Sequence, residues 1–455
     1  MSLIDKLKMA EHLKVGVDSD EEFDDWMIQS INSYKNLHMF ELQQATRVIE
    51  WISDKAIYVA GCEDGVRNEI LELTAPEKLL ATSENEGLSK ERDFKLRSGG
   101  FSDRPVYSLK YLPQTRLIIT SGPPDSSAQI WTLSRDDSDV IKVMKTVCPD
   151  NGSPHFCYLD THRDLTDTFL MGSTFHDIQV VDVSTGKPKF CSNNDSRERI
   201  CGLKFVDSNV CITCSGESEE ICTIDFRMCP SSQSQSSFSQ ADQSHGRKEC
   251  QSEVKGADQS QNSCEHDRKS QSSGQKLLHD LTEPPHQILP SDERKVKCLS
   301  FDICNKMNSN REEDTAKRMK LESDNMQIYR LTSNKEILIN DLRNINEPVT
   351  KMKLEIPGPT DETNTHLKIC PSHPNIISVS GFDNKVYIYD IKKIHQEASD
   401  QAKSLQPLFI HEGHMSGGST NQNTVVLEHT WHPWKEHLLM SSGSDGSLHA
   451  WEFVV

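Results

Sequence analysis

The chain has 455 residues and a formal net charge of -19 at pH 7, because 69 Asp and Glu residues outnumber 50 Lys and Arg residues. This charge opposes sequence-independent binding to nucleic acid or to an anionic membrane, since both would be repelled by the summed field. A hydrophobic content of 35 % predicts a folded core diluted by disordered segments. No apolar run approaches the roughly 20 residues of a membrane helix.

The start of the sequence and its cysteines indicate an intracellular protein. The first residues, MSLIDKLKMAEHLKVG, lack the apolar stretch of a secretion signal. The 14 cysteines are scattered singly through predicted strands. This usage is typical of a reducing compartment, so we expect them to remain thiols without structural disulfides.

The N-terminal part of the chain divides into two predicted segments. Residues 1–21 are expected to form a flexible tail. Residues 22–37, EFDDWMIQSINSYKNL, repeat large apolar side chains at three- and four-residue intervals behind an acidic first turn, which predicts one amphipathic helix. Its apolar stripe either packs on the protein's own folded domain or docks into a partner, with Phe23 and Trp26 as candidate contacts.

Seven hairpins follow one another after this helix. Three of them share a tight turn with an aspartate that precedes a large aromatic residue by six positions. These pairs are Asp125 and Trp131, Asp383 and Tyr389, and Asp445 and Trp451. Four weaker copies have second strands that end near residues 73, 182, 225 and 341. The spacing is roughly 40 to 60 residues wherever no insertion intervenes.

A third strand precedes several of the hairpins. It is visible as VYSLKYLP before the second hairpin and as VLEHTWHP before the last. A fourth strand is expected in the connection to the next unit. Four-stranded sheets that recur every forty-odd residues are typical of propeller blades. We therefore predict an all-β, seven-bladed propeller with blades in residues 38–228 and 295–455.

The last hairpin carries residues of a known repeat. Gly413-His414 and Trp451-Glu452 stand where the WD-repeat family has its Gly-His and Trp-Asp pairs. In that family the N-terminus supplies the outer strand of the last blade. Because few residues follow this hairpin, we expect the same closure, with residues 38–42 as the closing strand.

The same resemblance implies a structural network in the last blade. A strand hydroxyl, from Ser442 or Ser441, would accept the indole N–H of Trp451. His414 would link that hydroxyl to Asp445 in the turn. The serine, histidine and aspartate are thus expected to be scaffold, and not a hydrolase site.

Two polar stretches interrupt the predicted blades. In residues 229–294, Ser and Gln make up roughly half of the first part and no apolar periodicity is visible, which predicts a disordered insert. A charged loop is predicted at residues 304–323. Within it Lys317, Arg318 and Lys320 match a nuclear-import signal, and the alternative is a solvated loop without that role.

Two clusters superficially suggest a metal. Cys211 and Cys214 form a CxxC, but within a strand residues i and i+3 point to opposite faces, which favours core thiols. The segment 411–414, HEGH, is one residue short of the zinc motif HExxH. No nucleophile elbow, phosphate-binding loop or dinucleotide fingerprint appears. We predict a protein that is not an enzyme and uses no metal or cofactor.

Longer stretches resemble one family within the WD-repeat proteins. They include DDWMIQSINSYKNLHMFELQQATRVIEWISDKAIYVAG, ERDFKLRSGGFSDRPVYSLKYLPQTRLIITSG and SGFDNKVYIYD. The resemblance implies a noncatalytic cytoplasmic protein that also associates with mitotic spindle poles and microtubules. It further implies binding to the paired metallo-β-lactamase-type subunits of the Integrator RNA endonuclease, together with an associated assembly factor.

Two functions are therefore weighed. The favoured one is a monomeric scaffold that stabilises the endonuclease pair, without direct binding of nucleic acid. The alternative is a microtubule or spindle-pole scaffold, in which tubulin or spindle components would be partners. Arg97, Phe101 and Arg104 join Phe23 and Trp26 as candidate partner contacts on chemical type alone, and each could equally be internal packing.

Overall fold

The computed structural model describes residues 32–80, 93–133, 140–149, 152–228, 296–305, 326–358, 361–392, 404–414 and 424–454. Nearly all of them lie in strands and turns. Within these ranges no helix is long and apolar enough to cross a membrane. The predicted tail and the predicted Ser/Gln-rich insert lie outside these ranges, and so does the charged loop apart from its first two residues. Those two residues end strand β17 (Cys298–Asn305), so that part of the loop prediction is wrong.

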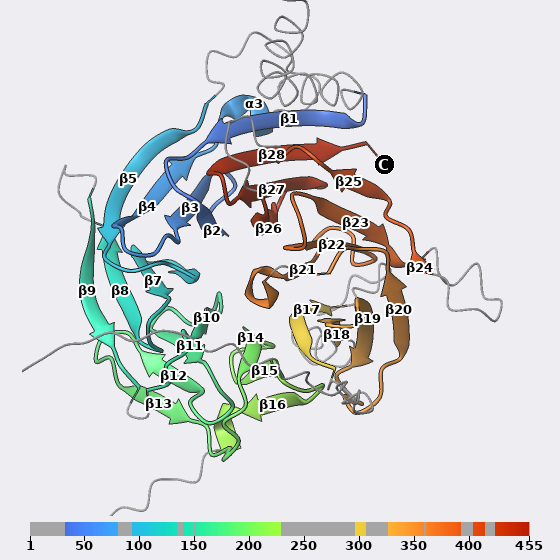
Figure 1. The fold of residues 1–455 in the computed structure, drawn as a ribbon. Coiled ribbons are helices and arrows are strands. Elements are labelled where there is room, and N and C mark those ends of the chain that lie inside the picture. Colours follow the sequence, from blue (N-terminus) through green and yellow to red (C-terminus); the bar gives the residue numbers. More distant parts are fainter. Residues whose placement is uncertain are drawn as a thin grey trace, which may run out of the picture. The chain divides into compact units, whose positions relative to one another are not determined.

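The strands form seven sheets arranged in a ring, which confirms the seven-bladed propeller (Figure 1). The first three blades have four strands each. The strands of the first blade are β2 (Thr46–Trp51), β3 (Ala56–Gly61), β4 (Asn68–Thr74) and β5 (Lys95–Ser102). Those of the second are β6 (Ser108–Leu112), β7 (Leu117–Ser121), β8 (Ala128–Leu133) and β9 (Ile141–Val147). Those of the third are β10 (Tyr158–Asp160), β11 (Thr168–Gly172), β12 (Gln179–Asp182) and β13 (Pro188–Cys191).

The remaining four blades complete the ring. The described strands of the fourth blade are β14 (Ile200–Phe205), β15 (Val210–Ser215) and β16 (Ile221–Asp225). The fifth blade contains β17, β18 (Met326–Thr332), β19 (Glu336–Asp341), β20 (Thr350–Leu354) and β24 (Ser404–Leu405). The sixth contains β21 (His366–Ile369), β22 (Ile376–Ser380), β23 (Val386–Asp390) and β25 (Phe409–His411). The seventh contains β26 (Val426–Trp431), β27 (Leu438–Gly443), β28 (Ser447–Phe453) and β1 (Tyr34–Glu41).

Strand β1 closes the ring by pairing antiparallel with β28 (Figure 1). In this pair Tyr34 lies opposite Phe453 and Leu37 lies opposite Trp451. Closure by an N-terminal strand is therefore confirmed. The predicted helix is wrong over residues 34–37, because pairing with β28 satisfies the backbone and lets Tyr34 and Leu37 pack on the core beside Trp451. Residues 22–31 of that helix lie outside the described residues.

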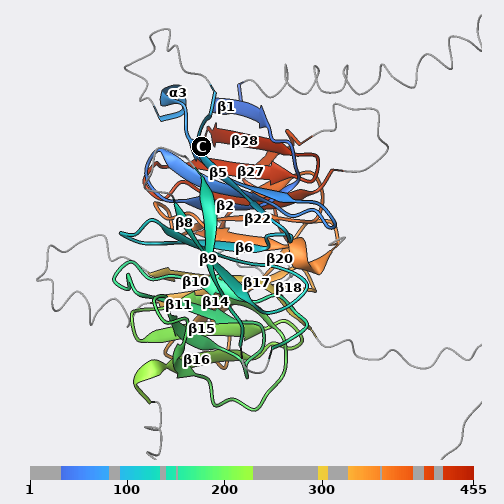
Figure 2. The ribbon, with the colours of Figure 1, turned by 90° about the vertical axis from the view of Figure 1, so that its left-hand side faces the viewer.

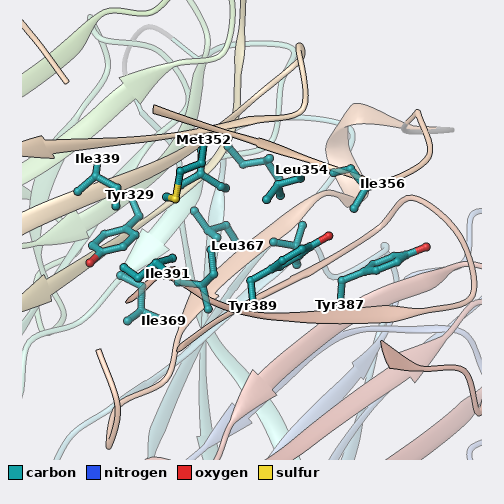
Figure 3. Close-up of a cluster of buried hydrophobic side chains, with 14 of the residues drawn as sticks. Tyr329, Ile339, Met352, Leu354, Ile356, Leu367, Ile369, Tyr387, Tyr389 and Ile391 are labelled. Carbon is teal, nitrogen blue, oxygen red and sulfur yellow. The ribbon is translucent and has the colours of Figure 1, made fainter. Parts of the chain in front are cut away.

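Neighbouring blades bury their apolar side chains against each other. The cluster between the fifth and sixth blades joins Tyr329 and Ile339 to Leu367 and Tyr389 (Figure 3). Tyr389 is fully buried, as is Trp451 in the seventh blade. Burial of a tryptophan of that size contributes up to about 5 kcal/mol at roughly 25 cal/mol per Å², so these aromatic positions hold the blades together.

Two glycines in the hairpin turns are required by the backbone. Gly381 and Gly446 have φ angles of 95° and 86°, in the left-handed region. A Cβ at Gly446 would lie 2.6 Å from the carbonyl oxygen of Leu42, whose N–H donates to the Gly446 carbonyl at 2.8 Å. The turn of the last hairpin therefore packs closely against the end of the closing strand.

Candidate functional site

The last blade contains a buried chain of hydrogen bonds. The indole N–H of Trp451 donates to Ser441 Oγ at 3.1 Å, and His414 Nε2 lies 2.8 Å from the same oxygen. His414 Nδ1 lies 2.7 Å from Ser447 Oγ, which donates to Asp445 Oδ1 at 2.6 Å. The histidine therefore reaches the turn aspartate through Ser447, which was not among the residues predicted for this network.

Ser442 has a different role from its neighbour Ser441. Its hydroxyl donates to the carbonyl of Thr46 on β2 at 2.7 Å, so it ties the seventh blade to the first. Both serines and His414 are fully buried. Their hydrogen bonds run between strands of the ring, so this arrangement supports scaffold chemistry and gives no substrate access to a nucleophile.

The second blade replaces the histidine by an arginine. Trp131 donates its indole N–H to Thr120 Oγ1 at 2.8 Å. Arg104 Nη1 lies 2.8 Å from Ser127 Oγ and 3.1 Å from Asp125 Oδ1, and Ser127 also donates to Asp125. The Arg104 side chain is only 15 % exposed. The structure thus places this candidate contact in the internal network of the blade.

The sixth blade uses Asp383 and Tyr389 separately. Asp383 Oδ2 accepts the hydroxyl of Tyr387 at 2.6 Å. The hydroxyl of Tyr389 is buried without a hydrogen-bond partner. Tyr389 fills the position of the tryptophan with its ring alone, and its six-residue spacing from Asp383 does not bring the two side chains into a hydrogen bond.

Three buried histidines meet at the edge of the seventh blade. His411, His414 and His449 place one ring nitrogen each within 4.8 Å of the others. His411 Nε2 lies 3.1 Å from His449 Nδ1, and Tyr34 Oη lies 2.7 Å from His411 Nδ1. Burial lowers the pKa of His449 to about 4, and it holds the pKa of His411 and His414 well below 6.5.

The geometry of these histidines favours packing over metal ligation. The rings of His414 and His449 stack at 3.9 Å with an interplanar angle of 8°. Lone pairs in the planes of two stacked rings run parallel and do not converge on one ion. Both nitrogens of His414 also bond to serines. The cluster is therefore a neutral, hydrogen-bonded core, and we assign no metal to it.

The thiols of the CxxC lie on opposite faces of β15. Cys211 packs in the apolar cluster with Leu170 and Phe205 of the third and fourth blades. Cys214 packs in the cluster with Cys298 and Ile328 of the fifth blade. Burial raises the pKa of Cys211 above its ordinary value, so the thiol is held protonated. Two ligands cannot converge from opposite faces of one strand.

A charged ring runs along the innermost strands of the blades. On each of these strands one residue lies opposite the central residue of the second strand. In blade order these residues are Glu50, Lys110, Asp160, Lys204, Asp302, Lys368 and Thr430. The charges alternate over six blades. Because the number of blades is odd, seven alternating charges would place two charges of the same sign on neighbouring blades. The uncharged Thr430 avoids this repulsion.

The ring links each blade to the next. Lys110 bonds Glu50 at 3.0 Å, and Lys204 bonds Asp302 at 2.5 Å. Asp302 Oδ2 also accepts the backbone N–H of Ile369 in the sixth blade at 2.8 Å. These residues are mostly paired across blades, so the ring is part of the scaffold and does not present an open charge for a ligand.

An exposed surface of a different kind lies on the outer strands of the first two blades. Gly99 of β5 and Val140, just before β9, form one parallel bridge, so the second half of β5 lies beside the start of β9 (Figure 2). We call this the β5–β9 surface. Its exposed large apolar side chains are Leu96, Phe101, Val140, Val143 and Met144. They are five of the eleven exposed large apolar side chains among the described residues, so apolar exposure is concentrated here.

The β5–β9 surface is also cationic. Residues 95–102 and 140–147 carry Lys95, Arg97, Lys142 and Lys145 but no Asp or Glu. Arg97 bonds the nearly buried Glu72 at 2.9 Å, and Arg67 of the neighbouring turn lies 4.9 Å above the Phe101 ring. Arg67 also pairs with Asp103, directly after β5, at 3.3 Å, so the excess of positive charge is confined to the two strands themselves.

The predicted partner contacts thus have different outcomes. Arg97 and Phe101 lie on the β5–β9 surface and Arg104 lies inside the second blade. Phe23 and Trp26 lie outside the described residues, and so do Lys317, Arg318 and Lys320 of the predicted import signal. Sequence reasoning missed Val143 and Met144. The signal was the run VIKVMKTV, which places apolar and cationic residues together in a predicted outer strand.

The fold and its polar networks define a class, the seven-bladed WD-repeat propeller with structural Trp-Ser-His and Trp-Thr links. No family model matches the chain. The chain is 31 % identical over 440 residues to "Integrator complex assembly factor WDR73" of Danio rerio, which covers 96 % of this chain and 98 % of that protein. The protein of the same name from Homo sapiens is 30 % identical over 441 residues, with 95 % and 97 % covered. The chain therefore belongs to the WDR73 family, as its sequence resemblance predicted.

Proposed function

We propose that the chain is a noncatalytic assembly factor that binds and stabilises the RNA endonuclease heterodimer of the Integrator complex. The observation that carries the proposal is the near full-length identity to relatives named "Integrator complex assembly factor WDR73". The fold supports it, because a propeller offers several rigid faces large enough for a protein interface of the standard size. The buried networks described above use the titratable residues for packing and leave none of them poised as a nucleophile.

The proposed partners are the paired metallo-β-lactamase-type subunits and an associated assembly factor. The chain itself would act as a monomer. Strand β1 already pairs with the outer edge of β28, so the ring needs no second copy to close. The net charge of -19 supports protein partners over direct contact with RNA.

Affinity purification of the full chain from cells tests the proposal. We expect the two endonuclease subunits to co-purify in stoichiometric amounts, and their levels to fall when the chain is depleted. Light scattering on the isolated chain should give a monomer mass. Recovery of the chain without either endonuclease subunit, with normal subunit levels after depletion, would reject the proposal.

A second candidate is a microtubule or spindle-pole scaffold. The observation in its favour is the cationic β5–β9 surface, because a tubulin polymer is acidic and would otherwise repel an acidic chain. Co-sedimentation of the purified chain with polymerised tubulin tests it directly. A chain that stays in the supernatant at low salt would count against direct binding.

We place the protein in the cytoplasm and, in mitosis, at spindle poles. Lys317, Arg318 and Lys320 would permit import into the nucleus, which is where the assembled Integrator complex would act. Imaging of the tagged chain in interphase and mitosis tests the placement. Replacing the three basic residues by alanine should reduce any nuclear signal, and an unchanged signal would remove them as the import element.

A further inference from the structure

The β5–β9 surface combines two features that a protected sheet edge does not combine. Lysines on an outer strand commonly prevent pairing with other chains, so Lys142 and Lys145 alone would need no partner. Large exposed apolar side chains have the opposite effect, because they favour contact. Phe101 is 51 % exposed, and Val143 and Met144 are each 47 % exposed. The apolar side chains therefore require an explanation that edge protection does not supply.

Both outer strands carry a bulge within this surface. On β5 the register shifts between Ser98 and Leu96, which leaves Arg97 without an opposite residue on β4. On β9 it shifts between Lys145 and Val143, which leaves Met144 without one on β8. A bulge redirects its side chain and interrupts the ladder, so it presents Arg97 and Met144 outward and opposes addition of a further strand. Docking here would use side chains.

The charge of the surface selects the partner. Four cations and no carboxylates lie on these two stretches, in a chain of net charge -19. We propose that the β5–β9 surface docks a folded partner protein that presents an apolar centre flanked by carboxylates. This inference rests on the proposed function, in which the chain works by binding proteins, and it adds where the partner binds and what chemistry it presents.

A phosphate polymer fits these observations less well. Binding of RNA needs cations but makes no use of exposed Val143 and Met144 on a strand, and the net charge of -19 opposes approach to an anionic membrane surface. The centre of a protein interface consists of such apolar side chains, with charged groups at its rim. Arg97 is additionally held by Glu72, which fixes its position for a partner carboxylate on the exposed side.

Zero-length cross-linking tests the location. The complex of the full chain with the endonuclease heterodimer is treated with a carbodiimide, which joins lysine amines to carboxylates. We expect cross-links from Lys142 or Lys95 to Asp or Glu of the partner. A stable complex whose cross-links avoid both outer strands would overturn this inference and leave the proposed function standing. A complex with a protein other than the endonuclease heterodimer, cross-linked at Lys142, would support this inference and reject the proposed function.

Substitutions test the chemistry on the same full-length chain. Val143→Asp and Lys142→Glu should each weaken binding of the heterodimer by about tenfold or more, as measured by biolayer interferometry. Val349→Asp and Lys353→Glu are matched controls, because they alter an exposed apolar and an exposed cationic residue of the fifth blade. Unchanged melting temperatures would show that the variants fold. Equal binding by all four variants would overturn the inference.

Two further probes separate the other classes of ligand. Anisotropy of a labelled 20-nucleotide RNA and flotation with phosphatidylserine vesicles should show no binding that depends on Lys142. Micromolar binding of either probe that is lost in Lys142→Glu and kept in Val143→Asp would overturn the protein-docking proposal.

Discussion

Trp431 of the seventh blade donates its indole N–H to Ser378 of the sixth blade at 2.8 Å. His429, two residues before it, lies 2.7 Å from the hydroxyls of both Ser378 and Ser380. The first strand of one blade thus supplies the tryptophan and the histidine to its neighbour. Tyr389 occupies the corresponding position within the sixth blade, and its own hydroxyl has no partner.

Removal of the shared acceptor, Ser378, should lower the free energy of unfolding more than removal of Ser380. Ser378→Ala leaves two buried groups unpaired, Trp431 Nε1 and one nitrogen of His429, whereas Ser380→Ala leaves only the other nitrogen of His429. An unpaired buried polar group costs about 1–3 kcal/mol. We expect Ser378→Ala to lower the free energy of unfolding by about 2–5 kcal/mol and Ser380→Ala by about half as much, measured by urea denaturation. Equal losses would show that the Trp431 hydrogen bond contributes nothing.

The buried histidines predict loss of stability in mild acid. Burial lowers the pKa of His429 to about 3 and that of His449 to about 4. In the unfolded chain both titrate near 6.5. Below that pH the unfolded state binds more protons than the folded state, so the free energy of unfolding falls as the pH drops. The loss reaches about 1.4 kcal/mol per pH unit for each such histidine.

Thermal unfolding between pH 7.5 and pH 5 checks this expectation. The melting temperature should fall steadily below pH 6.5, before exposed carboxylates begin to titrate. His449→Gln is the control, because it removes one titrating group and should reduce the slope by about one proton even if it lowers stability at pH 7.5. A melting temperature that is constant over this range would contradict neutral burial of the cluster.

Much of the propeller could be predicted from the sequence because the patterns that indicate its hairpins span only neighbouring residues. The six-residue spacing from Asp125 to Trp131 and from Asp445 to Trp451 follows from one strand and one turn. The predicted ends of the second hairpin strands match the observed ends, such as Thr74 and Asp341, to within one residue. Alternation and turn chemistry decide these elements without knowledge of tertiary contacts.

The remainder depends on contacts between distant residues. Tyr34–Leu37 continue a helical pattern, but their structure is decided by β28, far along the chain. Arg104 has the chemistry of a contact residue, and only the position of Ser127 shows that it is internal. The link through Ser447 and the charged ring across blades likewise depend on which strands become neighbours. The amino-acid composition does not show which strands become neighbours.

Substitutions at Asp302 and Lys204 of the charged ring should lower the stability of the protein by different amounts. Asp302 holds Lys204 and also accepts the N–H of Ile369, so its carboxylate joins three blades. Lys204 is about one third exposed and can remain solvated. We expect Asp302→Asn to destabilise the protein by about 1–3 kcal/mol and Lys204→Met by less than 1 kcal/mol. Urea denaturation of both variants checks this, and a larger effect for Lys204→Met would contradict the assignment.

Thiol reactivity should follow burial. Burial raises the pKa of Cys157 to about 12, so about one molecule in ten thousand carries its thiolate at pH 8. Cys148, which directly follows β9 of the second blade, is exposed, whereas Cys157 directly precedes β10 of the third blade. We expect iodoacetamide to alkylate Cys148 at least about 100-fold faster than Cys157 in the folded protein, and both at similar rates in guanidinium. Peptide mass spectrometry over time measures both rates. Similar rates in the folded protein would be the contrary result.

Because β1 closes the ring by pairing with β28, damage to either strand should prevent correct folding of the domain. Removal of Trp451–Val455 takes away the core tryptophan and the end of β28. Substitution of His38 by Pro leaves every other residue in place. Because Leu42 N–H donates to Gly446, the alternation of the ladder directs the His38 N–H toward Ala450 of β28, so proline there removes a ladder hydrogen bond and exposes the β28 edge. We expect both variants to aggregate or to elute as oligomers in size-exclusion chromatography. Asn36→Ala, which removes only a hydrogen bond to Glu452, should stay monomeric. A monomeric His38→Pro variant that melts cooperatively at the wild-type temperature would show that the ring does not depend on this strand.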